Sequence, residues 1–153
     1  MKINKKGHAG AVCATKTELL SREEFKRQVF ARSCGACVFF GKPSVDAHHI
    51  LERKLFVDGG YYLLNGAAVC EVHHWDCEST ALSVEAVRAA AGLTGPALLP
   101  SALDPAGTYD KWGNRVWPSG LRSWGPLESD TGARRALAQG GYLAVMMPAA
   151  YYE

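Results

Sequence analysis

The sequence lacks any apolar run that approaches the roughly 18–20 residues of a membrane span. Its first ten residues, MKINKKGHAG, also lack the apolar stretch of a signal peptide. We therefore expect a cytoplasmic protein without a membrane partner. An internal repeat is absent too, and 153 residues suffice for one domain with a modest core. The apolar fraction of 48% excludes disorder throughout the chain.

Net charge is also small, at +2, but the charges are unevenly distributed. Residues 1–60 contain eleven Lys/Arg and six Asp/Glu, whereas residues 61–153 contain six and nine. A basic leading half is typical of proteins that bind a polyanion such as nucleic acid. A solvated helix face would account for the same charges equally well. Charge therefore favours nucleic-acid binding without establishing it.

Cysteines and histidines are concentrated in one part of the chain. Five cysteines is an odd number, which in a reducing compartment favours metal ligation over a disulfide framework. Cys13 stands apart and is interpreted as a bystander thiol. Two doubled histidines and three cysteines fall between positions 34 and 74: Cys34, Cys37, His48, His49, Cys70, His73 and His74.

A helix is predicted just before this group. Ser21 is a good N-cap, Glu24 completes a capping box, and Leu20 can pack onto Phe25. The apolar stripe at helical spacing, expected to face the core, consists of Phe25, Val29 and Phe30. The opposite face is basic and could touch phosphates; it carries Arg22, Lys26, Arg27 and Arg32.

Two short strands, Val38–Phe40 and Ala47–Leu51, are predicted around a Gly-Lys-Pro-Ser turn. Residues 58–62 are expected to form a loop, and Asn65-Gly66 a turn. A helix is predicted over residues 71–78. Four metal-binding side chains would face the same way along it, at i, i+3, i+4 and i+7: Cys70, His73, His74 and Cys77.

Another helix is predicted from Ser83 to about Ala91, closed by Gly92. Beyond Pro96 the chain is rich in Gly and Pro, and we expect an irregular wrap with a helix near Gly132–Gln139. The expected organisation is a flexible basic arm (1–16), a metal-binding core (17–95) and a C-terminal extension packed on the core (96–153).

The cysteine group predicts a structural zinc site. Cys34, Cys37 and Cys70 supply three thiolates, and His73 gives a Cys₃His set with reasonable spacing. Cys77 is the alternative fourth ligand. A lone Cys-x-x-Cys can instead be a redox pair, which is disfavoured because the matching Cys/His half is present. Such a zinc would contribute folding energy to a small unit with little core.

The second group, His48, His49, Asn65 and His74, suits metal-assisted hydrolysis of a phosphodiester. That reaction needs a deprotonated water and a cation against the charge that develops on phosphate and on the leaving oxygen. One histidine of the first pair can bind the metal while the other takes the proton. His74 would complete the protein's share of the coordination sphere. The alternative is that one pair consists of ordinary core or surface imidazoles.

At these residues the chain resembles the zinc-clipped branch of the HNH endonucleases, which have the ββα-metal fold. The similarity covers about residues 21–80. It implies that His49 is the general base, that His48 and His74 bind the catalytic divalent metal, and that Asn65 braces the loop holding the base. It also favours His73 over Cys77 as the fourth zinc ligand.

The sequence departs from the family at two positions. Many members have Asp at the position of His48 and Cys at the position of His73. The nitrogen-rich site makes Mn²⁺, Ni²⁺ or Zn²⁺ conceivable beside Mg²⁺. In some members the central Asn itself binds the metal, so the role of Asn65 stays open. The stretch Tyr109–Asn114 is similar to one in stand-alone microbial and phage HNH proteins, and core packing by its aromatic residues is expected.

Four further residues are weaker candidates. Arg53 and Lys54 could clamp a phosphate, although ordinary surface charge is an equal alternative. Asp46 is close enough in sequence to orient a histidine. Glu78, four residues after His74, is another possible ligand, but a solvated helix residue is the favoured interpretation.

Together these features predict an α+β protein with a ββα-metal core, a structural zinc knuckle, a preceding helix and an irregular C-terminal extension. The predicted activity is that of a phage or bacterial DNA endonuclease, with double-stranded DNA favoured as substrate and a homodimer left open. A neutral histidine base would give activity that rises through a pKa near 6.5 if unperturbed. The alternative is a non-catalytic zinc-binding module that binds nucleic acid.

Overall fold

The computed structural model describes residues 18–148 of the chain. The predicted basic arm and Cys13 lie outside the described residues. In chain order the elements are α2 (Arg22–Arg32), β1 (Asp46–His49), the short 3₁₀ turns η1 (Arg53–Leu55) and η2 (Leu63–Asn65), β2 (Gly66–Val69), α3 (Glu71–Glu78), α4 (Val84–Ala90), β3 (Arg115–Val116), β4 (Arg122–Ser123), η3 (Pro126–Ser129), α5 (Thr131–Gln139) and α6 (Tyr142–Met146).

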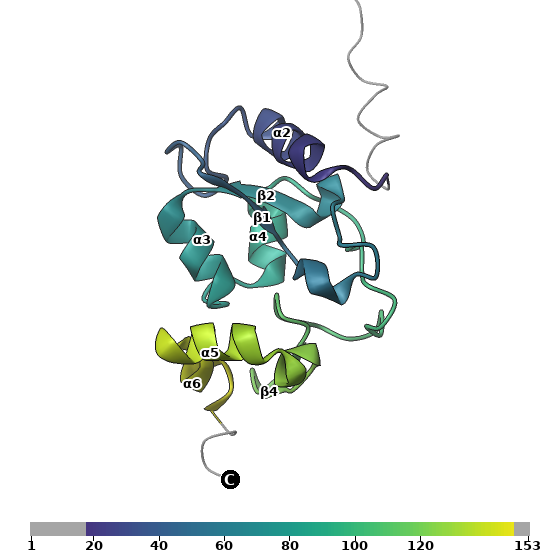
Figure 1. Cartoon of the computed structure of the whole chain (residues 1–153), viewed down its shortest axis with the longest axis vertical. Helices are drawn as coiled ribbons and strands as arrows, with labels where there is room; N and C mark the ends of the chain where they lie inside the picture. Colours follow the sequence, from purple (N-terminus) through teal and green to yellow (C-terminus); the bar gives the residue numbers. More distant parts are fainter. Residues whose placement is uncertain (1–17, 149–153) are drawn as a thin grey trace, which may run out of the picture.

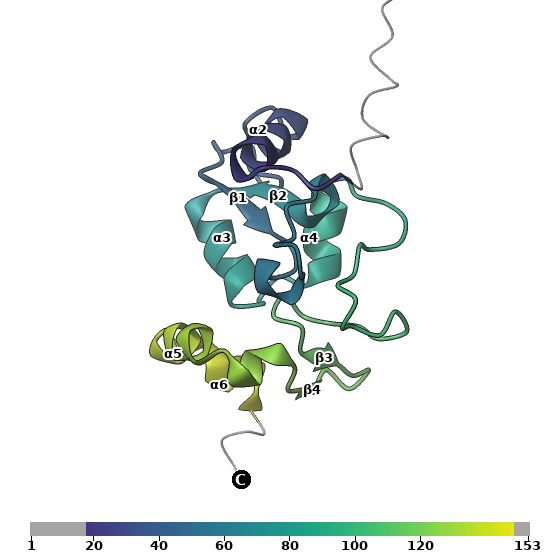
Figure 2. The same cartoon turned by 45° about the vertical axis from the view of Figure 1, so that its right-hand side comes forward.

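The centre of the fold is a small antiparallel sheet between helices. Strands β1 and β2 pair with Asp46 opposite Val69 and His49 opposite Gly66. Helix α2 covers one face of this sheet, whereas α3 and α4 lie on the other side (Figures 1 and 2). Helices α5 and α6 form a further layer beyond α3 and α4. The protein is therefore α+β, as predicted, with the order β1, β2, α3 at its centre.

Helix α2 begins as its sequence predicts. The Ser21 hydroxyl accepts a hydrogen bond from the Glu24 backbone N–H at 3.1 Å. The Glu24 carboxylate does not complete the predicted box, because it instead accepts hydrogen bonds from Arg27 and Gln28. The buried residues of the helix are Phe25 and Val29, which pack on Ala47 and Ala68 of the sheet.

The predicted strand Val38–Phe40 is wrong. These residues form bends between Cys37 and Pro43, and β1 pairs instead with β2, whose first residue, Gly66, was predicted to lie in a turn. Gly66 opens β2 because α2 passes close above it: a Cβ on Gly66 would lie 2.4 Å from Val29 Cγ2. The sequence Asn65-Gly66, which predicted a turn, thus marks the end of η2 and the point where α2 passes close to β2.

Helix α4 follows its prediction closely. Ser83 accepts a hydrogen bond from Ala86 N, and Gly92 takes the left-handed conformation (φ +71°) just after the helix. Val84 and Val87 are buried in a cluster that also contains Cys37, Cys70 and Cys77.

The C-terminal extension is more regular than predicted. Its expected helix is present as α5, and a second helix, α6, follows at once. These helices and η3 build a separate apolar cluster, so the description as an irregular wrap is wrong for residues 126–129 and 142–146; the buried members of the cluster are Leu127, Leu137, Leu143, Met146 and Met147. Residues 96–125 do lack long elements. Across residues 18–148, no helix has both the length and the apolar character needed to span a membrane.

Candidate functional site

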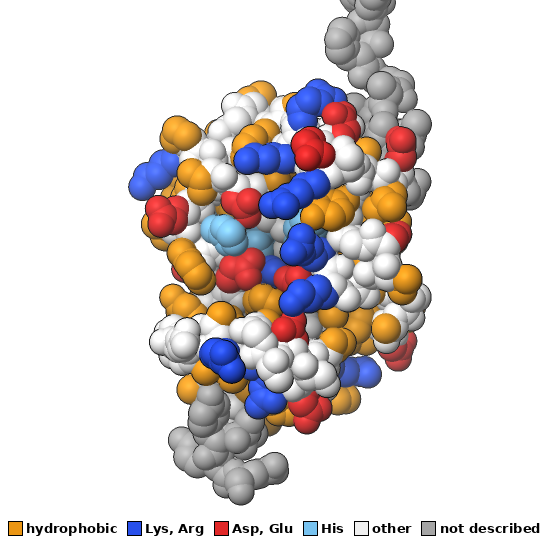
Figure 3. Space-filling view, in the orientation of Figure 1, with side chains coloured by type: hydrophobic (Ala, Val, Ile, Leu, Met, Phe, Trp, Pro, Cys, Tyr) orange, Lys and Arg blue, Asp and Glu red, His pale blue; other side chains and the backbone are white. Residues whose placement is uncertain are grey.

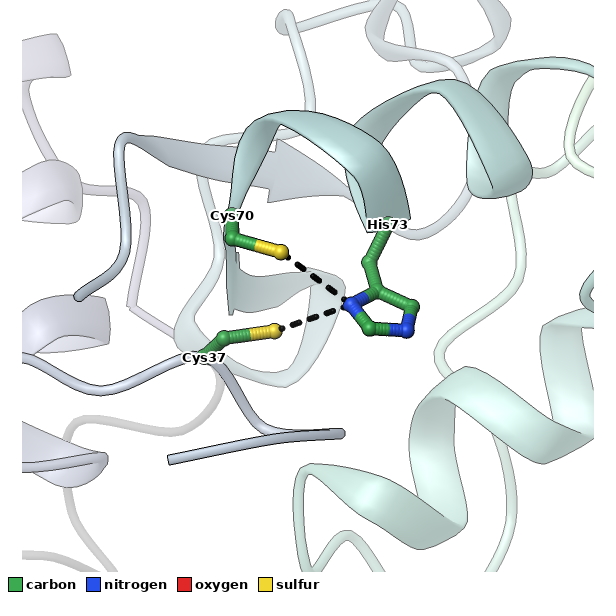
Figure 4. A group of neighbouring side chains, drawn as sticks. All are labelled: Cys37, Cys70 and His73. Atoms are coloured by element: carbon green, nitrogen blue, oxygen red, sulfur yellow. Dashed lines mark hydrogen bonds between the residues drawn. The ribbon is translucent and has the colours of Figure 1, made fainter. Parts of the chain in front are cut away.

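The first candidate metal group consists of Cys37, Cys70 and His73. Their ligand atoms all lie within 4.8 Å of one another, and all three residues are buried. His73 Nδ1 lies 3.1 Å from Cys70 Sγ and 3.5 Å from Cys37 Sγ, so the ring nitrogen points between the two sulfurs (Figure 4). Cys70 is the N-cap of α3 and His73 lies in its first turn, which brings both to one side of the helix.

The loop that carries Cys37 is folded tightly against this group. Cys37 N donates to Lys42 O at 2.7 Å. Burial raises the pKa of the Cys37 thiol, but backbone hydrogen bonds from Phe40, Cys70 and Phe39 outweigh it and lower the pKa overall. The rings of Phe39 and Phe40 lie 4.9 and 4.7 Å from the His73 ring and shield it. The backbone hydrogen bonds around Cys37 therefore favour its thiolate form.

Two predicted zinc ligands lie outside the group. Cys34 is exposed and sits in the left-handed conformation (φ +54°) at the start of the turn. Cys77 is 1% exposed among apolar side chains, where burial raises the pKa of its thiol to about 12. Cys77 is thus a neutral core thiol. The structure brings together three of the four predicted ligands, and Cys34 as the fourth stays a prediction.

The second candidate metal group consists of His48 on β1 and His74 and Glu78 on α3. Glu78 Oε1 lies 3.4 Å from His48 Nδ1 and 3.3 Å from His74 Nε2. His74 and Glu78 are one helical turn apart and so share a face of α3. The favoured interpretation of Glu78 as a solvated residue is wrong: its side chain is 21% exposed and faces both histidines.

Charge and burial set the protonation of this group. Burial raises the pKa of Glu78, but the hydrogen bonds with His48 and His74 and the Lys111 ammonium hold it well below its usual range. Burial lowers the pKa of His48, which is therefore a neutral imidazole, while the Glu78 hydrogen bond raises that of His74. The group thus offers a carboxylate and imidazole nitrogens, all ligands that divalent metals accept.

Both donor sets fit the metals that the sequence resemblance implies. The first supplies two sulfurs and one imidazole nitrogen in a buried setting, which is zinc chemistry. In the second, His48 Nδ1 and His74 Nε2 both face Glu78 Oε1, at 3.4 and 3.3 Å, so two imidazole nitrogens and a carboxylate oxygen lie close enough to share one divalent ion.

His49 faces the opposite side of β1, because successive residues of a strand alternate in direction. Its ring stacks on Phe25 at 4.7 Å and meets Tyr61 edge-on at 5.0 Å. Burial lowers the pKa of His49 to about 4, so the ring is neutral near pH 7. The value near 6.5 was expected only for an unperturbed ring, and burial moves the pKa of His49 below it.

A hollow of about 310 Å³ opens beside His49. Its basic lining residues are Arg22, Lys26 and Arg53. Asp46 also lines it, and Asp46 Oδ2 lies 3.4 Å from His74 Nδ1, so the hollow adjoins the second metal group. Figure 3 shows histidine side chains at the surface, carboxylates next to them and a column of Lys and Arg side chains alongside.

Asn65 lies under the loop that follows the two histidines. Its Oδ1 accepts from Leu51 N at 2.9 Å, and its Nδ2 donates to Leu51 O at 2.9 Å. Asn65 is 2% exposed, and both of its side-chain polar atoms are occupied by backbone. It therefore braces the loop that follows β1.

The other basic candidates have separate environments. Arg53 Nη1 donates to the Tyr61 hydroxyl at 3.0 Å and lines the hollow. Lys54 Nζ pairs with Asp130 at 3.1 Å and is exposed. Arg32, predicted on the basic face of α2, instead donates to the carbonyls of Leu63 and Gly66.

Sequence reasoning missed Lys111. This residue of the C-terminal extension is buried, and its Nζ lies 2.8 Å from Glu52 Oε2 and 3.2 Å from Glu78 Oε1. Lys111 lies within the stretch Tyr109–Asn114, but a lysine 33 positions from the carboxylate of Glu78 leaves no local spacing signal. Packing by Trp112 against the C-terminal cluster is present as predicted.

The chain matches no protein-family model, and searches of curated proteins and of solved structures found no significant match.

Proposed function

We propose that this protein is a metal-dependent DNA endonuclease of the HNH type with a ββα-metal core. The observation that carries the proposal is the convergence of His48, His74 and Glu78 from β1 and α3, with the neutral ring of His49 next in the strand. An ionised carboxylate and two imidazoles on a strand–helix pair suit a divalent metal, and an adjacent neutral imidazole suits a general base.

A structural zinc is proposed at Cys37, Cys70 and His73. This group joins the loop after α2 to the start of α3, and so fixes the helix that carries His74 and Glu78. Zinc at this position would stabilise the core, which has only two four-residue strands, and would set the position of α3 against β1. Cys34 is the proposed fourth ligand.

In the proposed mechanism, neutral His49 accepts a proton from the attacking water, using the imidazole lone pair that its low pKa keeps free. His48, His74 and Glu78 would hold a divalent metal, Mg²⁺ or Mn²⁺ or another such ion, which supplies positive charge against the phosphate and the leaving oxygen. Asn65 holds the backbone of Leu51, two residues after the base, and thereby limits its motion. Asp46 orients the ring of His74 through Nδ1.

The hollow beside His49 supports a nucleic-acid substrate. Arg22 and Lys26 project from α2, and Arg53 follows β1, so three cations line one opening next to the proposed base. Phosphate oxygens of a DNA backbone are the natural partners of such a group. Double-stranded DNA is the proposed substrate. One such site cuts one strand, so cleavage of both strands would require two visits or a dimer.

The test is incubation of the zinc-loaded protein with supercoiled plasmid in Mg²⁺, Mn²⁺, Ni²⁺ or EDTA. Metal-dependent nicking is expected, and His49→Ala should lower its rate by at least about 100-fold. His49→Ala should retain zinc and divalent-metal binding, whereas His74→Ala should lose the second metal. DNA binding without cutting under every metal would instead support a non-catalytic zinc-binding module.

A further inference from the structure

Lys111, in the C-terminal extension, places a positive charge against the second metal group. Its Nζ lies 3.2 Å from Glu78 Oε1, the same oxygen that faces His48 and His74. The Lys111 ammonium is thus in contact with the carboxylate of Glu78, which is also a proposed metal ligand. This contact is long-range in sequence, because tertiary packing brings the extension to α3.

The ammonium of Lys111 has a complete set of partners. Besides Glu78, it contacts Glu52 Oε2 at 2.8 Å and lies 4.3 Å from the centre of the Trp112 ring. Lys111 is only 4% exposed, and a buried ammonium is stable only when such partners surround it. Glu52 also donates its backbone N–H to the Lys111 carbonyl at 2.9 Å.

A rigid turn presents this lysine. Asp110 Oδ1 accepts from the backbone N–H groups of Trp112 and Asn114, and Asn114 Nδ2 donates to Asp110 Oδ2. Gly113 takes the left-handed conformation (φ +82°) that the turn requires. The Trp112 indole N–H donates to the Glu78 carbonyl at 2.8 Å, which ties the turn to the end of α3.

The consequence for metal binding follows from charge. A divalent ion beside Glu78 would be repelled by the ammonium and would share its carboxylate with it. Loss of Lys111 would free both Glu78 and Glu52, and would remove one positive charge from a poorly solvated site. Lys111 also orders Glu78, but loss of orientation is the smaller effect, because His48 and His74 still contact the same carboxylate.

We propose that Lys111 is an internal counter-ion that competes with a divalent metal for Glu78 and thereby weakens metal binding at this site. It stabilises the metal-free core and joins the extension to α3, at the expense of metal affinity. This inference rests on the proposed metal site, but not on DNA cleavage.

The test measures Mn²⁺ binding to zinc-loaded, DNA-free protein by electron paramagnetic resonance and calorimetry. Lys111→Met should lower the dissociation constant for Mn²⁺ by at least about tenfold, because a unit charge is removed near the ion. Lys111→Arg keeps the positive charge and should bind Mn²⁺ more weakly than Lys111→Met does. The melting temperature without Mn²⁺ should fall in Lys111→Met, and its rise on adding Mn²⁺ should exceed that of the wild type.

The control is Lys54→Met, which removes another ion pair between the core and the extension, that with Asp130, without touching Glu78. Its Mn²⁺ affinity should equal that of the wild type. If Lys111→Met does not fold, Lys111→Gln is judged by the same criterion. Unchanged or weaker Mn²⁺ binding in the folded variant would overturn the proposal, as would absence of a second metal site in the wild type. Failure of the wild type to cut DNA while it binds Mn²⁺ would count only against the proposed nuclease.

Discussion

Asn65 pairs with both backbone groups of Leu51, accepting from its N–H and donating to its carbonyl, each at 2.9 Å. A side-chain amide thus takes the place of a strand partner just after β1. The segment that it holds begins two residues beyond His49. The position of the proposed base therefore depends on a residue at the end of η2, fourteen positions from Leu51.

Replacement of this amide should disturb both stability and the site. Asn65→Ala leaves a buried N–H and a buried carbonyl of Leu51 without partners, which should cost about 2–4 kcal/mol in the free energy of unfolding. Asn65→Asp keeps the acceptor for Leu51 N but places a carboxylate oxygen against the Leu51 carbonyl in a buried site, so it should cost at least as much near neutral pH. Urea unfolding of the zinc-loaded protein measures both. A wild-type midpoint for Asn65→Ala would contradict the bracing role.

Gly66 should tolerate no side chain. A Cβ at this position would lie 2.4 Å from Val29 Cγ2 and 2.9 Å from the Phe25 ring, so Gly66→Ala must displace α2 from the sheet. A destabilisation of about 1–3 kcal/mol is expected. Gly41→Ala is the matched control, since a Cβ there meets nothing within 4 Å, and it should change stability by no more than about 0.5 kcal/mol. Thermal melting compares the two variants.

Cys37 and Cys77 should respond differently to substitution, because Cys37 is a proposed zinc ligand and Cys77 is a core thiol. Cys37→Ser should lose zinc and destabilise the protein by several kcal/mol, on the order expected for a structural zinc. Cys77→Ala removes a sulfur that is equally buried but lies outside the metal group, so it should keep one zinc per chain and cost about 1–2 kcal/mol. Zinc content by mass spectrometry and the melting temperature distinguish them.

Cys34→Ser examines the fourth ligand separately. Reduced zinc affinity with a preserved fold would support Cys34 in that role. Full zinc content and wild-type affinity would assign the fourth position elsewhere. Because Cys34 is exposed, its loss should cost little stability except through the metal.

His49 should remain neutral across the physiological range. Burial lowers its pKa to about 4, so the native protein releases this proton at a lower pH than the unfolded chain does. Between about pH 4 and 6.5 the unfolded chain binds more protons, and the contribution of this group to stability rises with pH. Below about pH 4 that contribution is lost.

An NMR titration of the histidine imidazoles in zinc-loaded protein without a second metal measures this directly. The His49 resonance should not shift between pH 5 and 8, whereas His74, whose pKa the Glu78 hydrogen bond raises, should titrate above its usual range. His49→Gln assigns the signal. A His49 midpoint near pH 6.5 would contradict the buried environment. If the pKa of His49 is instead near 4, as expected, any rise of activity near pH 6.5 would come from another group.

The local features of this protein were predictable from sequence. Ser21 and Ser83 begin helices because a side-chain oxygen satisfies an N–H group three residues along. Cys70 and His73 share one side of α3 because they lie three residues apart at its start. Phe25 and Val29 lie four residues apart and so share one face of α2, which predicted the buried face of this helix.

Only the tertiary structure determined which distant segments meet. Strand β1 pairs with β2, and not with the segment before it, because α2 and α3 enclose that pair from both faces. From its sequence position, Glu78 would be an ordinary exposed helix residue. In the fold, β1 places His48 next to it and the extension places Lys111 next to it. Interactions within one helical turn are set by backbone geometry, and spacing in the sequence reveals them. Contacts between elements depend on how buried side chains pack together, and that determined the candidate metal site and the charge next to it.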